Sequence, residues 1–299
     1  MCDVAKKFEE WGEWLCGGDV HSIQQQIFRM MWNAAVFNLI RKARELALED
    51  GKGEVQHNWA ISQFILTAYF ETQSITIRRL LDKGSPRGNK NREVYSLWRL
   101  LTDIENNCDL LTRENILTNT GCPYDYESAL SELHQRDISG PELARISFSE
   151  EMHGRIDSLT ATGASSRKPD DTVKPEAIEI LTRRLSQCQE MCDYVNKFVA
   201  HPATPESRRK KKADDIRITL GKISEAHRIL CQTAAFIATN VLGEHFDHFV
   251  VESARDVFEN LTIPFASEEV LAQLHEEWDT YKCNAEKWAH WNWQAELCG

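Results

Sequence analysis

Apolar residues recur along most of this chain at alternating steps of three and four, with polar residues between them. One unbroken run of this kind follows Asp19 and consists of Val20, Ile23, Ile27, Met30, Ala34 and Phe37. This spacing puts the side chains on one face of an α-helix, whereas a strand alternates at every second position. We therefore expect a long amphipathic helix here, which Asp19 starts, after a short helix that Asp3 caps and that ends at Gly17 and Gly18.

Two more helices are predicted after the glycine-containing break at residues 51–53. The first runs from Trp59 to Lys83, and its inward positions are Ile61, Phe64, Ile65, Ala68 and Ile75. The second runs from Glu93 to about Asn107. The repeat of three and four supports both helices.

A pair of antiparallel helices is predicted in the second half of the chain. Pro175 suits the first turn of a helix. The apolar stripe that follows it is Ile178, Leu181, Leu185, Cys188, Cys192, Val195 and Val199. The same rhythm returns in Ile216, Leu220, Ile223, His227, Leu230, Ala234, Ile237 and Val241. Two such stripes joined by a loop are typical of neighbouring helices in a bundle, and His227 is then expected as a hydrogen-bonded histidine of the core.

The remaining regions are less regular. Residues 110–159 contain short helical pieces broken by glycine and proline, and Thr160 to Lys174 is predicted to be a flexible loop. Ser267 can cap a last helix in which Trp278, Trp288, Trp291 and Trp293 occur. We interpret these tryptophans as packing onto the bundle; the alternative is a partner interface or a platform on which bases stack.

The predicted fold is all-α: a multi-helix antiparallel bundle with an irregular helical insertion. We expect N-terminal helices in 1–53 that pack on the bundle, the bundle itself in 54–242 with the insertion at about 108–174, and Trp-rich helices of the same domain in 243–299. No stretch reaches the roughly 18 apolar residues of a membrane-spanning helix, and the first residues lack a secretory apolar core. Nine irregularly spaced cysteines suggest free thiols. We therefore expect a cytoplasmic protein without a membrane partner.

Charge is distributed unevenly along the chain. The formal net charge of −11 argues against a protein that covers itself with nucleic acid. Residues 201–212, however, hold five basic residues against Glu206, a net +4 that leaves −15 for the rest of the chain. These basic residues are Arg208, Arg209, Lys210, Lys211 and Lys212. They form either a solvated loop tip or a phosphate-binding loop beside His201.

A polar residue and a histidine precede this basic run, at the end of the helix that Pro175 begins. Asn196 and His201 are the two candidates for chemistry, with Lys197 beside them. We call residues 196–212 the basic pole. A helix-terminal histidine followed by Pro202 also has a purely structural interpretation, in which the ring contacts the last carbonyl groups and the proline ends the helix.

The run from Tyr194 to His201 resembles the motif of the HEPN superfamily, all-helical proteins of abortive-infection, toxin–antitoxin and RNA-guided defence systems. Residues 75–82, which contain Arg78 and Arg79, also resemble the abortive-infection branch. The resemblance covers about residues 54–242 and implies a metal-independent endoribonuclease site, usually shared across a dimer. In that site an arginine lies before the polar residue; here the position is Val195, which belongs to the apolar stripe.

Metal-free cleavage of RNA needs proton transfer, which a histidine can perform, and a cation that stabilises the developing phosphorane. With Val195 in the place of the arginine, the cation would have to come from Lys197, Arg78 or Arg79. Metal sites at the Cys188 and Cys192 pair or at His245 and His248 are weaker alternatives, because structural zinc requires four converging ligands. No cofactor motif is present in the sequence.

Two functions follow from these patterns. The first is a HEPN-like protein of a prokaryotic defence or toxin–antitoxin setting that binds RNA at the basic pole and cleaves it if the site is active. The second is a catalytically inactive helical scaffold that holds a partner protein. A homodimer or a partner protein is expected in either case.

Overall fold

The computed structural model describes residues 4–49, 58–84, 94–133, 140–199, 204, 218–246, 248–250, 253, 255–259 and 268–287. These residues form helices and no strand; Thr112 and Thr172 make one isolated antiparallel bridge. The chain divides into two compact units, Met1–Val251 and Glu252–Gly299, a boundary nine residues later than the end of the bundle expected from the sequence. The all-α prediction is confirmed.

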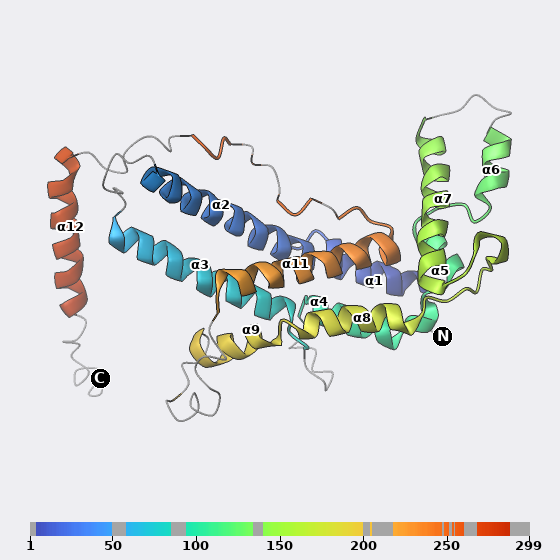
Figure 1. The fold of residues 1–299 in the computed structure, drawn as a ribbon, viewed down its shortest axis with the longest axis horizontal. Coiled ribbons are helices and arrows are strands. Elements are labelled where there is room, and N and C mark those ends of the chain that lie inside the picture. The colour runs from blue at the N-terminus through green and yellow to red at the C-terminus, as the bar shows by residue number, and fades with distance from the viewer. Residues whose placement is uncertain are drawn as a thin grey trace, which may run out of the picture. The chain divides into compact units, whose positions relative to one another are not determined.

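The described residues of unit 1 before residue 108 form four helices (Figure 1). They are α1 (Val4–Cys16), α2 (Ile23–Glu49), α3 (Trp59–Leu80) and α4 (Leu97–Asn106). α2 and α3 run side by side, and side-chain caps begin α3 and α4: the Asn58 side chain accepts from the Ile61 amide at 3.1 Å, and Ser96 Oγ accepts from the Arg99 amide at 3.1 Å. These caps satisfy amide groups that lack a partner within the helix.

The second half contains the pair predicted to be antiparallel. α11 (Leu220–Ile237) packs against α8 (Pro175–Ser186) and also against α2 and α3. The prediction of one continuous helix from Pro175 is wrong. The helix tightens at Gln187 and Cys188, whose amides bond three residues back, resumes as α9 (Gln189–Tyr194), and widens into a π-helical turn at Val195–Val199.

A second π-helical turn, Ala238–Leu242, extends α11 and ends at Gly243. Gly243 has φ of 72°, and a Cβ atom there would lie 2.1 Å from the Thr120 side chain. Only glycine meets both conditions, because it adopts positive φ without a steric penalty.

The insertion is helical but irregular, as predicted. It contains a 3-10 turn (Cys108–Leu110), α5 (Arg113–Asn119), α6 (Tyr126–Leu133), α7 (Gly140–Thr160) and a second 3-10 turn (Ala164–Ser166). The expected flexible loop at 160–174 is instead tied down: the Val173 amide bonds to Leu111 O at 3.0 Å, and the Arg113 amide bonds to Asp171 O at 2.8 Å.

One apolar core joins the helices of unit 1. The stripe on α2 is buried from Ile23 to Phe37, while Val20 precedes the helix and is exposed. The inward face predicted for α3 is wrong in its first half, since Ile61 and Phe64 are exposed; the helix buries Ile77 and Leu80 instead. No helix among the described residues has the length and apolar content needed to cross a membrane.

Unit 2 contains α12 (Glu268–Lys287). Its described side chains are exposed within that unit, apart from the half-buried Ala285, and Trp278 is 70% exposed. The described part of this helix therefore shows no packing onto a core. Trp288, Trp291 and Trp293 lie outside the described residues.

Candidate nucleic-acid-binding site

Val195 and Asn196 begin the widened turn at the end of α9 and face opposite environments. Val195 is 1% exposed, so the position of the missing arginine is part of the core, as the apolar stripe predicted. Asn196 is exposed. A π-helical turn shifts the side chains that follow it and occurs frequently at functional sites. Here the π-helical turn begins at the step from the buried Val195 to the exposed Asn196.

Arg78, from the last turn of α3, contacts Asn196 although 118 residues separate them. Its Nε donates to Asn196 Oδ1 at 2.8 Å. A guanidinium only donates, so the amide oxygen of Asn196 has to face it. The packing of α9 and the widened turn against α3 brings the two side chains together (Figure 1).

The remaining donors of Arg78 are only partly used by the described residues. Its Nη1 lies 3.7 Å from Asp82 Oδ2, one helical turn further along α3. Nη2 has no hydrogen-bond partner among the described residues. The Arg78 side chain is 38% exposed, so this edge of the guanidinium is accessible to a ligand.

The other candidate site residues are placed as follows. Arg79 is exposed and makes no contact with Asn196, because successive residues of a helix point about 100° apart. Lys197 is half-buried in the widened turn. His201 and the basic run Arg208, Arg209, Lys210, Lys211 and Lys212 lie outside the described residues.

The two cysteines near the basic pole, Cys188 and Cys192, are buried core residues with unreactive thiols. Burial raises the pKa of Cys192 to about 11, although the nearby charge of Arg78 acts in the opposite direction. Burial, with the neighbouring Cys192 and Glu225, raises the pKa of Cys188 to about 12. A thiol binds metal or attacks as the thiolate, so both are inert at neutral pH. The described residues contain no group of ligands that could hold a metal ion, at this pair or elsewhere.

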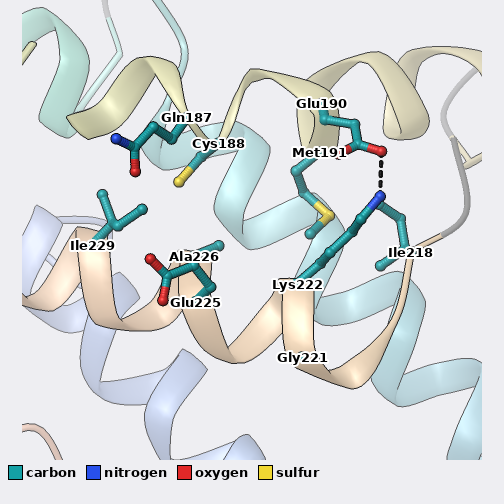
Figure 2. A pocket seen from close by; sticks show the side chains of 10 residues that line it. All are labelled: Gln187, Cys188, Glu190, Met191, Ile218, Gly221, Lys222, Glu225, Ala226 and Ile229. Carbon is teal, nitrogen blue, oxygen red and sulfur yellow. Dashed lines mark hydrogen bonds and ion pairs between the residues drawn. The ribbon is translucent and has the colours of Figure 1, made fainter. Parts of the chain in front are cut away.

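A small hollow of about 210 Å³ lies between the tightened turn before α9 and the start of α11. Figure 2 shows Glu190 and Lys222 joined by an ion pair at one side, with Cys188 and Met191 pointing inward. The lysine already has a carboxylate partner, and most of the wall is apolar. The hollow adds no free charged group to the site.

Sequence analysis missed a cluster of charged residues in the insertion. Arg113 is fully buried, and its Nη2 and Nε contact Asp157 at 2.8 Å and Asp171 at 3.0 Å. Arg167 adds a second cation on Asp157 at 2.8 Å. Burial opposes ionisation of Asp157, but the hydrogen bonds from Arg167 and Arg113 outweigh it and lower its pKa.

His153 completes this cluster in a defined tautomer. Arg113 Nη1 lies 3.1 Å from His153 Nδ1, which must accept because the guanidinium donates; the ring proton therefore sits on Nε2, 2.9 Å from Tyr124 O. Burial lowers the pKa of His153, and the charges of Arg167 and Arg113 act in the same direction. A neutral, fully bonded histidine at 2% exposure holds the insertion together and is not available for catalysis.

His227 is the buried histidine that its place in the apolar stripe predicted. Its Nε2 lies 2.8 Å from Gln73 Oε1, and the Gln73 amide nitrogen donates to Met30 O at 3.2 Å. Burial lowers the pKa of His227 to about 4. The hydrogen-bonded core histidine is thus confirmed.

No protein-family model, curated protein or solved structure matches this chain. The contact between Arg78 and Asn196 is therefore the observation that bears most directly on function.

Proposed function

We propose that this chain is a HEPN-like RNA-binding protein of a prokaryotic defence or toxin–antitoxin setting, acting in the cytoplasm through the basic pole. One observation carries the proposal: Arg78 Nε donates to Asn196 Oδ1 at 2.8 Å. A guanidinium thus lies beside Asn196, the polar residue of the motif. It comes from α3, because the position where the motif has its own arginine is Val195 in this chain. The all-α fold agrees with the resemblance.

The pair is suited to binding phosphate. Asn196 holds the guanidinium of Arg78 by Nε, so the Nη edge is oriented before a ligand arrives. Arginine binds phosphate through two parallel donors, and such preorganised contacts are stronger than those of a free side chain. The basic run that follows Asn196 in the chain supplies further positive charge, so this segment can attract a polyanion that the acidic remainder of the chain repels.

The same pair suggests how cleavage would proceed if the site is active. His201 would deprotonate the 2′-hydroxyl or protonate the leaving oxygen, and Arg78 would stabilise the charge on the phosphorane. Asn196 then serves to orient Arg78. Because the cation comes from the same chain, a complete site does not require residues from a second copy.

RNA binding is tested by fluorescence anisotropy with a single-stranded RNA, titrated at several salt concentrations. We expect Arg78→Ala to weaken binding several-fold and to reduce the slope of log K against log salt by about 0.7, the loss of one phosphate contact. Arg183→Ala is the matched control, since Arg183 is exposed on α8 and has no hydrogen bond to Arg78 or Asn196 among the described residues. Equal affinity of Arg78→Ala and wild type, or no binding by wild type at low salt, would refute the proposal.

Cleavage is tested separately, with the same RNA and without added metal. We expect His201→Ala to abolish any activity and Arg78→Ala to lower the rate by about a hundredfold or more, as for the loss of other groups that stabilise a transition state. Cleavage that both variants retain would mean that another site, or a contaminant, is responsible. Binding without cleavage would identify the chain as an RNA-binding protein without ribonuclease activity.

The second candidate is a protein-binding scaffold, and exposed apolar surface favours it. Trp59 and Phe64 on α3 are 76% and 74% exposed. Aromatic residues of this kind are enriched at protein interfaces.

A further inference from the structure

A cleft of about 920 Å³ lies between α2 and α11, within unit 1. From α2 it is lined by Met31, Ala34 and Asn38, and from α11 by Ser224 and His227. On each helix these residues recur at steps of three or four, so they share one face. Both helices also pack against α3 (Figure 1), which contributes to the lining as well. We call this space the α2–α11 cleft.

The size and walls of the cleft are those of a site for a small molecule. Ligand sites in proteins commonly enclose roughly 300–1,000 Å³ and are mostly apolar, with a few polar groups that fix the orientation of the ligand. Small residues on both helices, Ala35 and Gly221, belong to the lining and leave room between the backbones. Tyr69, Phe249 and Val250 add apolar surface.

His227 is a buried polar residue of this lining, and its tautomer is fixed by Gln73. The Gln73 amide nitrogen donates to Met30 O at 3.2 Å, so its Oε1 must accept, and it lies 2.8 Å from His227 Nε2. The ring proton therefore sits on Nε2. Burial lowers the pKa of His227 to about 4, so the ring is neutral at pH 7 and Nδ1 carries a lone pair.

The lone pair on His227 Nδ1 faces the cleft. Nδ1 makes no hydrogen bond with any described residue, and it is not among their enclosed side-chain atoms that lack a partner. It therefore has access to solvent, and for a ring that is 6% exposed this access is the cleft that it lines. A water molecule can donate to Nδ1. A ligand that displaces this water without loss must bring a donor of its own.

The charges around the cleft favour an uncharged donor. Arg41 is an exposed part of the lining, and its partner Glu45, at 3.7 Å, also serves Lys42 at 3.2 Å. One carboxylate thus faces two cations, which leaves a net positive charge. The charge of Arg228, also in the lining, is offset by Glu225, whose carboxylate accepts from Nε at 2.9 Å. A positively charged ligand would be repelled here.

We propose that the α2–α11 cleft binds a small, mainly apolar molecule that carries no positive charge and donates one O–H or N–H hydrogen bond to His227 Nδ1. Aromatic alcohols and indoles belong to this class. The proposal goes beyond the function of the basic pole and does not depend on it, because no residue of the basic pole lines the cleft.

The test uses two matched pairs of probes, phenol with anisole and indole with N-methylindole, titrated into the full chain and followed by ligand-observed NMR. In each pair the second molecule has a methyl group in place of the donor hydrogen. The cleft is much larger than either molecule, so the methyl group fits and by itself would strengthen binding by burying more apolar surface. We expect saturable binding of phenol and indole, about fivefold or more tightly than their methylated partners, the factor that one hydrogen bond supplies.

Ser224→Phe locates the site. Ser224 is exposed and lines the cleft, so a larger side chain there occupies the space without entering the core. We expect the affinity for phenol and indole to fall about tenfold or more, a loss of one decade in the binding constant. Ser186→Phe, at an exposed position on α8 outside this lining, is the matched control and should leave the affinity unchanged. Circular dichroism should be the same for both variants and wild type.

Nitrogen NMR of the histidine rings tests the contact itself. The Nδ1 resonance of His227 should move when indole is added and stay in place with N-methylindole, and His227→Gln assigns this resonance by removing it. The proposal is overturned if neither phenol nor indole binds up to its solubility limit, if the members of each pair bind equally, or if binding survives Ser224→Phe. These outcomes are separate from the RNA tests, since the probes and the variants do not involve the basic pole.

Discussion

Arg113 and Arg78 are both arginines that contact an acidic residue, yet their surroundings are opposite. Arg113 is fully buried and bonds to Asp157, Asp171 and His153. Arg78 is 38% exposed, bonds to one amide oxygen and lies 3.7 Å from Asp82. A buried charge has to be paired completely to be tolerated, whereas an exposed charge can keep donors free.

The contrast distinguishes an arginine that supports the fold from one that the proposed function requires. The Arg113 cluster uses its hydrogen-bonding capacity to fix α5, α7 and the segment that ends at Lys174. Arg78 contributes little to holding α3 and α9 together, because exposed polar pairs are weak. The tests that follow use this contrast in order of expected effect.

Removing Arg113 should have the largest effect. Arg113→Met leaves Asp171 with only the Lys168 amide and leaves His153 Nδ1 without a donor. We expect the free energy of unfolding to fall by about 3–5 kcal/mol, measured by urea denaturation. Arg183→Met, at an exposed position, should change it by less than about 0.5 kcal/mol. If the two variants were equally stable, the cluster would not be structural.

The second-largest expected effect is a loss of stability at acidic pH, caused by buried histidines. The pKa of His227 is lowered from 6.5 to about 4 by burial. Between these values the unfolded chain binds a proton that the folded chain does not. Stability is therefore complete above about pH 6.5 and falls as the pH drops towards 4, by about 3 kcal/mol in total. His153, with its lowered pKa, acts in the same direction.

Urea denaturation at a series of pH values measures this effect. His227→Gln should flatten the curve between pH 6.5 and 4, while Arg78→Ala should leave its shape unchanged. A curve that His227→Gln does not alter would show that folding leaves the pKa of this histidine unchanged.

Removing Arg78 should scarcely affect stability. We expect Arg78→Ala to change the free energy of unfolding by no more than about 0.5 kcal/mol, because the side chain is on the surface and its contacts are few. The same variant should lose RNA affinity. A large loss of stability would make Arg78 a second structural arginine, and its effect on RNA could then no longer be read as a contact.

The smallest effect is the coupling of Arg78 to Asn196. A double-mutant cycle of Arg78→Ala and Asn196→Ala in urea denaturation should give a coupling energy of about 0.5 kcal/mol. In RNA binding the two changes should be non-additive, since Asn196 acts by orienting Arg78. Fully additive losses of affinity would mean that each residue contacts RNA independently.

The sequence was informative where periodicity decides the structure. The stripe on α2 and the burial of Val195 and His227 followed from steps of three and four. Periodicity does not say what an apolar face meets, which is why Ile61 and Phe64 were predicted to be buried and are exposed. The break at Gln187 and Cys188 has no glycine or proline to mark it.

Contacts between distant residues were harder to predict. Arg78 and Arg79 were both candidate cations, and nothing in the sequence distinguished them. The rotation of α3 about its axis, as it packs against α9, points Arg78 at Asn196. The Arg113 cluster joins residues up to 58 positions apart, and none of them stands in a motif. Residues 161–174 are held in place by these hydrogen bonds, so the fixed conformation of the segment could not be inferred from its composition.

The π-helical turn at Val195–Val199 contains one more residue than an α-helical turn would. The direction of the chain after it therefore depends on the number of residues in the turn. Deleting one residue would restore ordinary α-helical spacing and rotate everything that follows by about 100° around the helix axis. The residues after the turn would then face another side of the helix relative to Arg78, although none of them had been substituted. Insertions and deletions in these five residues should therefore be as damaging as substitutions at Asn196 itself.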